Sequence, residues 1–374
     1  MSGALREGSV WALGMMSGTS LDGVDAALIE TDGVSIAATG PWRTAPYPAD
    51  LRARLLAVIE GRGARDEAEQ ALTRFHADLA EALLAEAGRS RGEIALVGFP
   101  GHTVRHEPAA GRTDQMGDGA ALARSLGIDV VNDFRSYDVA AGGQGAPLAP
   151  LFHAALARRS GLVPPLAVLN LGGVANVTWI GGPVDEDLLA FDTGPGCALI
   201  DDWVLGRTGA AFDRDGGLAR AGTVDRAALD ALMAHPYFDA TPPKSLDRNA
   251  FDPAPVRGLA AQDGAATLVA FTAEAAHRAL AHLPAPPRRW LVTGGGRHNP
   301  AIMAALASRL GALCDPVESV GWNGDALEAQ AFGFLAVRSL RRLPLSLPRT
   351  TGVPRPVRGG VHHPAQAVAT PRGG

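Results

Sequence analysis

Hydrophobic residues along this chain follow two patterns, short apolar runs that end at glycine and longer runs with helical spacing. An apolar run at 10–16 leads into a turn of Ser, Gly, Thr and Asp, and a second apolar run follows at 24–29. Two such runs around a polar glycine turn predict a β-hairpin in about the first 35 residues. Residues 166–180 repeat the pattern around Gly172-Gly173, so each half of the chain begins with the same predicted motif.

The remaining apolar runs predict alternating strands and helices. Predicted strands lie at 94–99, 128–131, 188–191 and 290–293, and predicted helices at 50–60, 65–89, 117–126, 151–159, just after Gly196, at 261–282, from about 300 and at 324–340. This alternation is typical of α/β proteins. The repeated opening hairpin predicts two similar α/β domains that face each other across a cleft, although the halves are too different in sequence to form a repeat.

Glycine and proline density suggests where the domains divide. The segment 140–150 is rich in both and is the best candidate for a hinge. We expect a first domain at 1–133, completed by the C-terminal helix, and a second at 134–343. Residues 341–374 contain six arginines and no acidic residue. Pro, Gly and Arg at this density predict a disordered tail over 344–374, and an arm that binds polyanions is the alternative.

Composition narrows the class of partner. The chain has 374 residues, of which 47% are hydrophobic, and a formal net charge of −5. This balance predicts a protein that binds neither nucleic acid nor an anionic membrane. Its two cysteines, Cys197 and Cys314, form no CxxC pattern, and no signal peptide or membrane-spanning run is evident. A reduced, cytoplasmic protein is the simplest interpretation.

Familiar nucleotide and hydrolase motifs are missing from the sequence. It contains no GxxxxGK[ST], no GxGxxG after a strand, no HExxH and no GxSxG. Three glycine turns remain, at 18–23, 172–173 and 294–296, each after an apolar strand. In one interpretation, these glycines do no more than allow the chain to form tight hairpins. Three such turns beside polar residues favour contact with phosphate or a nucleotide, and Asp22 and Asp25 can hold a hydrated Mg²⁺.

Asp192 is the most specific single candidate for a catalytic residue. It ends the apolar run LLAF and precedes Thr193 and a Gly-Pro-Gly turn before a predicted helix. A carboxylate at that point either caps the helix or acts as a general base. Thr193 is the better placed cap, so we expect Asp192 to be available as a base.

Other polar residues follow predicted strands, and each leaves two interpretations open. Asp133, Arg135 and Asp138 cluster after the strand at 128–131, and Arg135 can bind a carboxylate or join an interdomain ion pair. On the loop after Phe99, His102, Thr103 and His106 bind a polar ligand or lie on the surface. Asp118 is a ligand residue or a helix cap. Lys244 counters a phosphate or lies in solvent, and Glu328 is a rim charge or points into the cleft.

Together these segments resemble the anhydro-N-acetylmuramic acid kinase family. The matching stretches run in order from about residue 11 to 340: GTSLDGVD (18–25), QMGDGAALA (115–123), NDFRSYDVAAGGQGAPLAP (132–150), LNLGGVANVTWI (169–180), FDTGPG (191–196), TGGGRHNP (293–300) and DALEAQAFGFLA (325–336). Three stretches depart from the family pattern. GFPGHT (98–103) stands where the family has GHDGQT, so His102 replaces a glutamine. GPGC and PPKSLDRN replace GPGN and PPKSTGRE.

The resemblance implies an α/β fold of two duplicated domains with a central cleft. Each domain is expected to be like those of actin and ribonuclease H, and the two are expected to close over ATP and Mg²⁺. The implied nucleotide-binding residues are Gly18, Thr19, Ser20, Leu21, Asp22, Gly23, Val24, Asp25, Gly172, Gly173, Asn176, Gly294, Gly295, Gly296 and Asn299, with Asp22 and Asp25 on the metal. The implied substrate residues are His102, Thr103, Asp118, Asp133, Arg135 and Gly194. Asp192 matches the catalytic base, and Glu328 is expected to orient the water or metal.

The family's reaction opens the 1,6-anhydro ring of anhydro-N-acetylmuramic acid with water while O6 receives the γ-phosphoryl group. Its product, N-acetylmuramic acid 6-phosphate, is an intermediate of peptidoglycan recycling. O6 of the anhydro sugar carries no proton, so the base acts on the water that attacks C1, as in an inverting glycosidase. Arg135 is the expected partner of the lactyl carboxylate. A homodimer is expected. A sugar- or nucleotide-sensing protein and another kinase of this fold are the alternatives.

Overall fold

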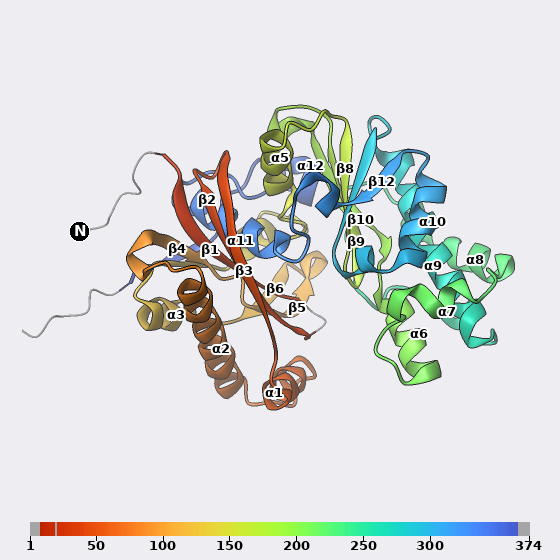
Figure 1. Cartoon of the computed structure of the whole chain (residues 1–374), viewed down its shortest axis with the longest axis horizontal. Coiled ribbons are helices and arrows are strands. Elements are labelled where there is room, and N and C mark those ends of the chain that lie inside the picture. The colour runs from red at the N-terminus through yellow and green to blue at the C-terminus, as the bar shows by residue number, and fades with distance from the viewer. Residues whose placement is uncertain (1–7, 19–20, 366–374) are drawn as a thin grey trace, which may run out of the picture. The chain divides into compact units, whose positions relative to one another are not determined.

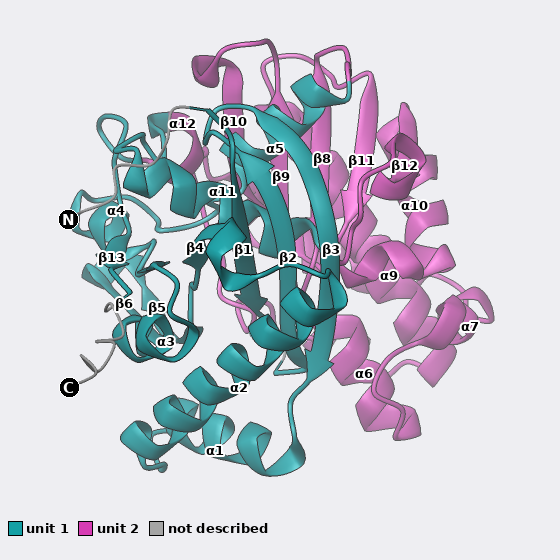
Figure 2. Ribbon diagram, turned by 60° about the vertical axis from the view of Figure 1, so that its left-hand side comes forward, with its two compact units in different colours: residues 1–160, 326–348, 353–374 teal, residues 161–325, 349–352 magenta. Residues whose placement is uncertain are grey.

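The computed structural model describes residues 8–18 and 21–365, so the predictions for Thr19 and Ser20 lie outside the described residues (Figure 1). The chain divides into two compact units (Figure 2). Unit 1 comprises Met1–Ser160, Ala326–Pro348 and Val353–Gly374, and unit 2 comprises Gly161–Asp325 and Arg349–Gly352. This division assigns residues 134–160 to unit 1, whereas the sequence analysis expected them in the second domain.

A six-stranded sheet with the order β13-β7-β4-β1-β2-β3 forms the centre of unit 1. Its strands are β1 (Val10–Ser17), β2 (Gly23–Thr31), β3 (Ile36–Pro46), β4 (Ile94–Gly98), β7 (Val130–Asn132) and β13 (Val361–His363). The other elements of this part of the chain are α1 (Ala49–Ile59), α2 (Arg65–Glu86), β5 (His102–Glu107), β6 (Arg112–Met116), α3 (Gly119–Leu126), α4 (Ser136–Ala140), α5 (Pro150–Arg159) and α11 (Leu327–Leu340), whereas α12 (Pro348–Thr351) falls in unit 2 except for Pro348.

Alternating residues of β1 and β2 divide between two faces of this sheet. Leu13, Val24 and Leu28 point into a core shared with α1, α2 and α3. On the opposite face, α11 lies so close to β1 that a Cβ on Gly14 would fall 1.8 Å from the carbonyl oxygen of Ala329. Glycine at this position is therefore required for the helix to contact the strand backbone.

A five-stranded sheet with the order β10-β9-β8-β11-β12 forms the centre of unit 2. Its strands are β8 (Leu166–Leu171), β9 (Val174–Ile180), β10 (Leu188–Pro195), β11 (Arg289–Thr293) and β12 (Leu313–Pro316). The helices are α6 (Ala198–Thr208), α7 (Gly217–Arg220), α8 (Arg226–Met233), α9 (Ala261–Arg278) and α10 (Pro300–Leu310). Side chains from α6, α8, α9 and α10 share one apolar core with one face of the sheet.

The two sheets have the same topology. In each, a first strand pairs antiparallel with a second, the second antiparallel with a third, and the first parallel with a fourth, which is parallel to a fifth. Only β13 has no counterpart in the described part of unit 2. The predicted α/β fold with two duplicated domains is confirmed by this shared strand order.

The C-terminal segment differs from its prediction. Residues 344–365 are ordered, because β13 pairs antiparallel with β7 and extends the sheet of unit 1. Asp129 accepts hydrogen bonds from the backbone amide of Ala365 at 2.9 Å and from His362 Nε2 at 2.8 Å. The prediction of a disordered tail is therefore wrong for 344–365. In the described part of the chain, no helix has the length and apolar character needed to cross a bilayer.

Candidate active site

Asp192 lies on a strand of unit 2, not at a helix start. β10 carries it opposite Asn176 of β9, and α6 begins only at Ala198. Its Oδ2 accepts a hydrogen bond from the backbone amide of Leu246 at 2.8 Å. The prediction that Thr193 caps the helix is wrong, because its hydroxyl donates to the carbonyl of Ala175 at 3.2 Å. Asp192 is therefore not a cap either, and its half-buried carboxylate is held by the backbone.

A row of polar residues crosses four strands at the level of Asp192. The register places Thr293 of β11 opposite Asn170 of β8, Asn170 opposite Asn176 of β9, and Asn176 opposite Asp192 of β10. Residues at one level of adjacent strands point to the same face. Asn170 was not predicted from the sequence, because only the pairing of β8 with β9 brings it into line with Asp192.

The backbone of Asp192 is hydrogen-bonded to Lys244 and to Tyr237. The amide of Asp192 donates to the carbonyl of Lys244 at 3.0 Å, and the phenol of Tyr237 donates to the carbonyl of Asp192. Burial and then the negative charge of Asp192 raise the pKa of Tyr237. Lys244 Nζ donates to the carbonyl of Tyr237 at 2.9 Å, and burial lowers the pKa of Lys244 to about 8. The Lys244 side chain is thus held by the carbonyl of Tyr237 rather than in bulk solvent.

The turn Gly172-Gly173 is hydrogen-bonded to the residues just before α6. The carbonyl of Gly172 accepts from the amide of Cys197 at 2.8 Å, and that of Gly173 accepts from Gly196 at 3.0 Å. A Cβ on Gly196 would lie 2.1 Å from the Gly172 carbonyl oxygen. Within the residues that the structure describes, the amides of Gly172 and Gly173 have no acceptor. Two adjacent backbone donors of this kind suit a phosphate group.

The second glycine turn of unit 2 follows β11. Gly294 has a φ of 76°, and a Cβ there would lie 2.4 Å from Oδ1 of Asn170. Gly295 is exposed, and a Cβ at that residue would have no atom within 4 Å, whereas Gly296 packs against Leu171. Asn299 caps α10 by accepting from the amides of two residues in its first turn at 3.0 and 3.3 Å. Asn299 thus shapes the turn through the helix it starts.

Gly194 lies beside Asp192 and is tightly packed. A Cβ there would fall 2.6 Å from Cβ of Ala275 on α9. Asp192, Gly194 and the two glycine turns all lie where β8, β10 and β11 end. These three strands run parallel, so their carboxyl ends meet at one edge of the sheet, where α/β proteins commonly bind ligands.

The first hairpin forms the corresponding edge of unit 1. The amide of Leu21, whose φ is 58°, donates to the carbonyl of Gly18 at 3.2 Å, and the amide of Tyr47 donates to the carbonyl of Asp22 at 3.1 Å. Gly23 packs against β3, and the side chains of Leu21 and Val24 are buried in the core, so these three residues shape the turn. Asp22 is exposed, and Asp25 accepts from the hydroxyl of Thr44.

A hydrogen-bonded chain of side chains supports this hairpin. Ser17 Oγ lies 2.6 Å from the phenol oxygen of Tyr47 and 2.8 Å from Nδ1 of His102. His102 is fully buried, and this burial lowers its pKa to about 4. Its Nε2 has no hydrogen-bonding partner among the described residues. His102 is therefore a neutral group at physiological pH, with one ring nitrogen still available to a ligand or water.

The other predicted substrate residues of unit 1 also act in local structure. Asp118 caps α3 by accepting from the amide of Ala121 at 2.9 Å. Asp133, with a φ of 49°, accepts from the first amide of α4 at 3.2 Å. Arg135 donates to the carbonyl of Gly145 at 2.9 Å, and Thr103 lies within β5. Asp118 thus fulfils the cap alternative, and Asp133 and Arg135 fix the turn that follows β7.

A pocket of about 540 Å³ lies within unit 1, between the end of α1, the β5–β6 hairpin and α4. Arg65, Arg105 and Arg112 line it, and only the Asp114 carboxylate among its lining residues opposes them, through two hydrogen bonds from Arg65. This pocket was not predicted from the sequence. Its charge suits an anionic group such as a carboxylate.

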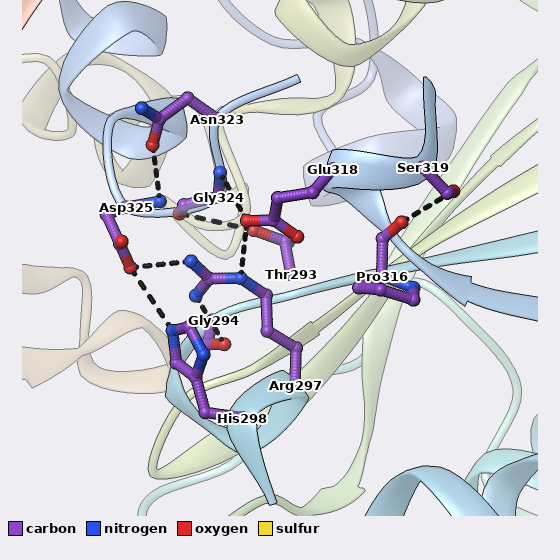
Figure 3. A network of polar contacts seen from close by, with 10 residues as sticks. All are labelled: Thr293, Gly294, Arg297, His298, Pro316, Glu318, Ser319, Asn323, Gly324 and Asp325. Carbon is purple, nitrogen blue, oxygen red and sulfur yellow. Dashed lines mark hydrogen bonds and ion pairs between the residues drawn. The ribbon is translucent and has the colours of Figure 1, made fainter. Parts of the chain in front are cut away.

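Glu328 is half-buried in the first turn of α11 in unit 1, so it belongs to a different unit from Asp192. The loop before it is fixed by Arg297, whose guanidinium contacts Glu318, Asp325 and the carbonyl of Gly294 (Figure 3). In the described part of the chain, no group of three or more His, Cys, Asp or Glu side chains forms a metal site.

Comparison with known proteins identifies a family model and relatives that match most of the chain. The family model described as anhydro-N-acetylmuramic acid kinase matches residues 10–365. Proteins of that name from Rhodospirillum rubrum and Acidiphilium cryptum are 57% and 58% identical over 371 and 356 residues, covering 97% and 93% of this chain and 97% of each relative. Among solved structures, component A of an (R)-2-hydroxyglutaryl-CoA dehydratase from Acidaminococcus fermentans matches with a TM-score of 0.48 at 13% identity, over 89% of this chain and all of that one.

Proposed function

The chain belongs to the anhydro-N-acetylmuramic acid kinase family, and from this premise we propose that it uses ATP to phosphorylate O6 of 1,6-anhydro-N-acetylmuramic acid while water opens the anhydro ring. The product is then N-acetylmuramic acid 6-phosphate, in peptidoglycan recycling. The observation that carries the proposal is Asp192, a carboxylate held on β10 in a row of polar residues beside two glycine turns.

Asp192 is the proposed base for the water. The water oxygen forms a bond to C1, its proton passes to the Asp192 carboxylate, and the C1–O6 bond breaks. The electron pair left on O6 attacks the γ-phosphorus, and ADP leaves. A base contributes here because the water has a proton to lose, whereas O6 has none. The amide of Leu246 fixes Oδ2 of Asp192, which restricts how the carboxylate approaches the water.

The two glycine hairpins are the proposed phosphate ligands. The amides of Gly172 and Gly173 offer two adjacent donors, and the turn at residues 18–25 is the matching element of the other unit. Gly294, Gly295 and Gly296 are proposed to flank the adenosine, since Gly295 is exposed on the turn after β11. Backbone amides aimed at phosphoryl oxygens stabilise the charge that builds in the transition state.

Mg²⁺ is part of the same proposal. It is usually held in kinases by one or two carboxylates together with substrate phosphates, not by a full cage of protein ligands. Asp22, exposed at the hairpin, and Asp25, three residues further on, fit that requirement. When bound, Mg²⁺ neutralises charge on the phosphates. A homodimer and a cytoplasmic location also belong to the proposal, and light scattering of the purified chain tests the dimer.

Incubation of the purified chain with ATP, Mg²⁺ and 1,6-anhydro-N-acetylmuramic acid tests the function. We expect ADP and a sugar phosphate heavier than the substrate by one phosphoryl group (HPO3) and one water, as measured by mass spectrometry. Glucose, N-acetylglucosamine and N-acetylmuramic acid in place of the anhydro sugar separate this activity from that of another sugar kinase. Binding of the anhydro sugar without any ADP formation would instead support the sensing alternative.

A further inference from the structure

A buried arginine joins two loops of unit 2 at the point where the chain leaves that unit. The side chain of Arg297 is 3% exposed. Its Nε donates to Glu318 at 2.9 Å, its Nη2 donates to Asp325 at 2.6 Å and its Nη1 donates to the carbonyl of Gly294 at 3.0 Å (Figure 3). One planar guanidinium thus meets three acceptors in three directions, which a lysine cannot reproduce.

The acceptors Gly294 and Glu318 belong to two different loops of unit 2. Gly294 opens the glycine turn after β11, where a Cβ would strike Asn170 and the backbone of Leu171. Glu318 also accepts from the amide of Gly324 at 3.1 Å, and a Cβ on Gly324 would lie 2.4 Å from Nε of Arg297. Arg297 therefore contacts both the glycine turn and the loop at 317–325 and joins them to each other.

The third acceptor, Asp325, is the last residue of this stretch of unit 2. The chain enters unit 1 at Ala326, and α11 begins at Leu327 with Glu328 in its first turn. Within unit 1, the same helix lies against the backbone of β1, the strand that leads to the first hairpin. Asp325 is thus the covalent link between the Arg297 contacts and the helix that carries Glu328.

We propose that Arg297 is a positioning residue that couples nucleotide bound at the turn 294–296 to the start of α11, and so to Glu328, through Asp325. This inference rests on the proposed function, because it takes that turn to be part of the nucleotide site. A ligand that orders the turn orders the guanidinium, and the guanidinium holds Asp325. The bond to Asp325 is the only one of the three that leads into α11, so its removal uncouples the helix while Glu318 still neutralises the arginine.

The variants Asp325→Ala and Asp325→Asn test this coupling, with Asp252→Ala as the matched control. Asp252 is also an aspartate of unit 2 paired with an arginine, but the pair with Arg257 is exposed. Coupling free energies between sites correspond to about 5- to 150-fold effects. We expect Asp325→Ala to lower kcat by at least about 5-fold while the KM for ATP changes by less than about 2-fold. Asp325→Asn, which keeps an acceptor, recovers part of the loss, and Asp252→Ala matches the unchanged chain.

Hydrogen exchange separates coupling from a general loss of structure and from failure of the proposed function. In the unchanged chain, a non-hydrolysable ATP analogue should slow exchange in peptides spanning 293–300 and 326–332. In Asp325→Ala, the first peptide should remain protected and the second should lose its protection. Equal protection of both peptides in the variant, or kinetics equal to those of Asp252→Ala, overturns the coupling. If the unchanged chain shows no protection at 293–300, the nucleotide site itself is wrong.

Discussion

Asp192 and Asn176 lie directly opposite each other in the ladder between β9 and β10. The candidate base is therefore carried by β10, the edge strand of the sheet, and its partner strand β9 is paired on the other side with β8, where Asn176 lies opposite Asn170. Groups placed on regular strands keep their positions better than groups on loops. The site can thus present the carboxylate to a water without first ordering a flexible segment.

The first prediction concerns the base. Asp192→Asn keeps the size of the side chain and a carbonyl oxygen that can accept from the amide of Leu246, but it removes the basic carboxylate. General base catalysis contributes about 10²- to 10⁴-fold, so we expect kcat to fall by that factor. Steady-state kinetics with ATP and the anhydro sugar measure kcat, and calorimetry with an ATP analogue measures nucleotide binding, which should be retained.

Asp252→Asn is the control for this substitution, because Asp252 lies on the surface in a pair with Arg257. Its kinetics should match those of the unchanged chain. An Asp192→Asn variant that turns over within about 10-fold of the unchanged chain would remove Asp192 from the role of base.

The second prediction compares two glycine-to-alanine changes close together in sequence. At Gly196 the added methyl group meets the carbonyl oxygen of Gly172, so the backbone must move and the free energy of unfolding should fall by about 1–3 kcal/mol. At Gly206, inside α6, the methyl group has nothing within 4 Å. Alanine is the better helix former there, so the free energy of unfolding should rise by about 0.5–1 kcal/mol.

Urea denaturation measures both glycine variants. Because the amides of Gly196 and Cys197 donate hydrogen bonds to the Gly172-Gly173 turn, we also expect Gly196→Ala, but not Gly206→Ala, to raise the KM for ATP. Equal stability of the two variants would show that α6 does not hold the turn as described.

The third prediction concerns pH. Burial lowers the pKa of His102 to about 4, from about 6.5 in the unfolded chain. Below pH 6.5 the unfolded state takes up a proton that the folded state does not, so the contribution of His102 to the free energy of unfolding is complete above pH 6.5 and is lost as pH falls toward 4. The loss amounts to about 2 kcal/mol at pH 5. His102→Gln should therefore weaken the fall in stability between pH 7 and pH 5.

The exposed His277 on α9 provides the control for this measurement. Urea denaturation of the His277→Gln variant should show the same pH dependence as the unchanged chain. If His102→Gln leaves the fall in stability as steep as before, His102 is not held neutral in the folded state.

The main elements of the fold could be predicted because their signals are local. The hairpins β1–β2 and β8–β9 are apolar runs joined by glycine turns, and α2, α9 and α11 show helical spacing. The strand β12 has only four residues, one of which is a proline, and β3 alternates exposed with less exposed residues. Neither strand therefore gives a clear apolar run in the sequence. β13 is defined by its pairing with β7, more than two hundred residues earlier in the chain, and not by a local pattern.

The same distinction holds for the site. Asp192 could be identified because it ends an apolar run, but its neighbours Asn170 and Asn176 line up with it only through the register of three strands. The role of Thr193 was predicted wrongly because Thr193 still lies within β10, several residues before α6 begins at Ala198. The predictions for Thr19 and Ser20 concern residues outside the described part of the chain.

The fourth prediction concerns the C-terminal segment. A chain that ends after Gly359 loses β13 and both hydrogen bonds to Asp129, which exposes the edge of β7. We expect its free energy of unfolding to fall by about 1–3 kcal/mol, as for the loss of a few backbone and side-chain hydrogen bonds. A chain that ends after Ala365 keeps all of these contacts and is the reference. Equal urea midpoints for the two chains would contradict the structural role of β13.

The central claim is that water attacks C1 while O6 receives the phosphoryl group, with Asp192 as the base for the water. Turnover in water enriched in ¹⁸O, followed by rapid reduction of the sugar and mass spectrometry of fragments, tests it most directly. We predict one ¹⁸O atom on C1 of the sugar phosphate, none on O6 and none in the phosphoryl group. Label in the phosphoryl group, or a phosphorylated product without label on C1, would contradict the account.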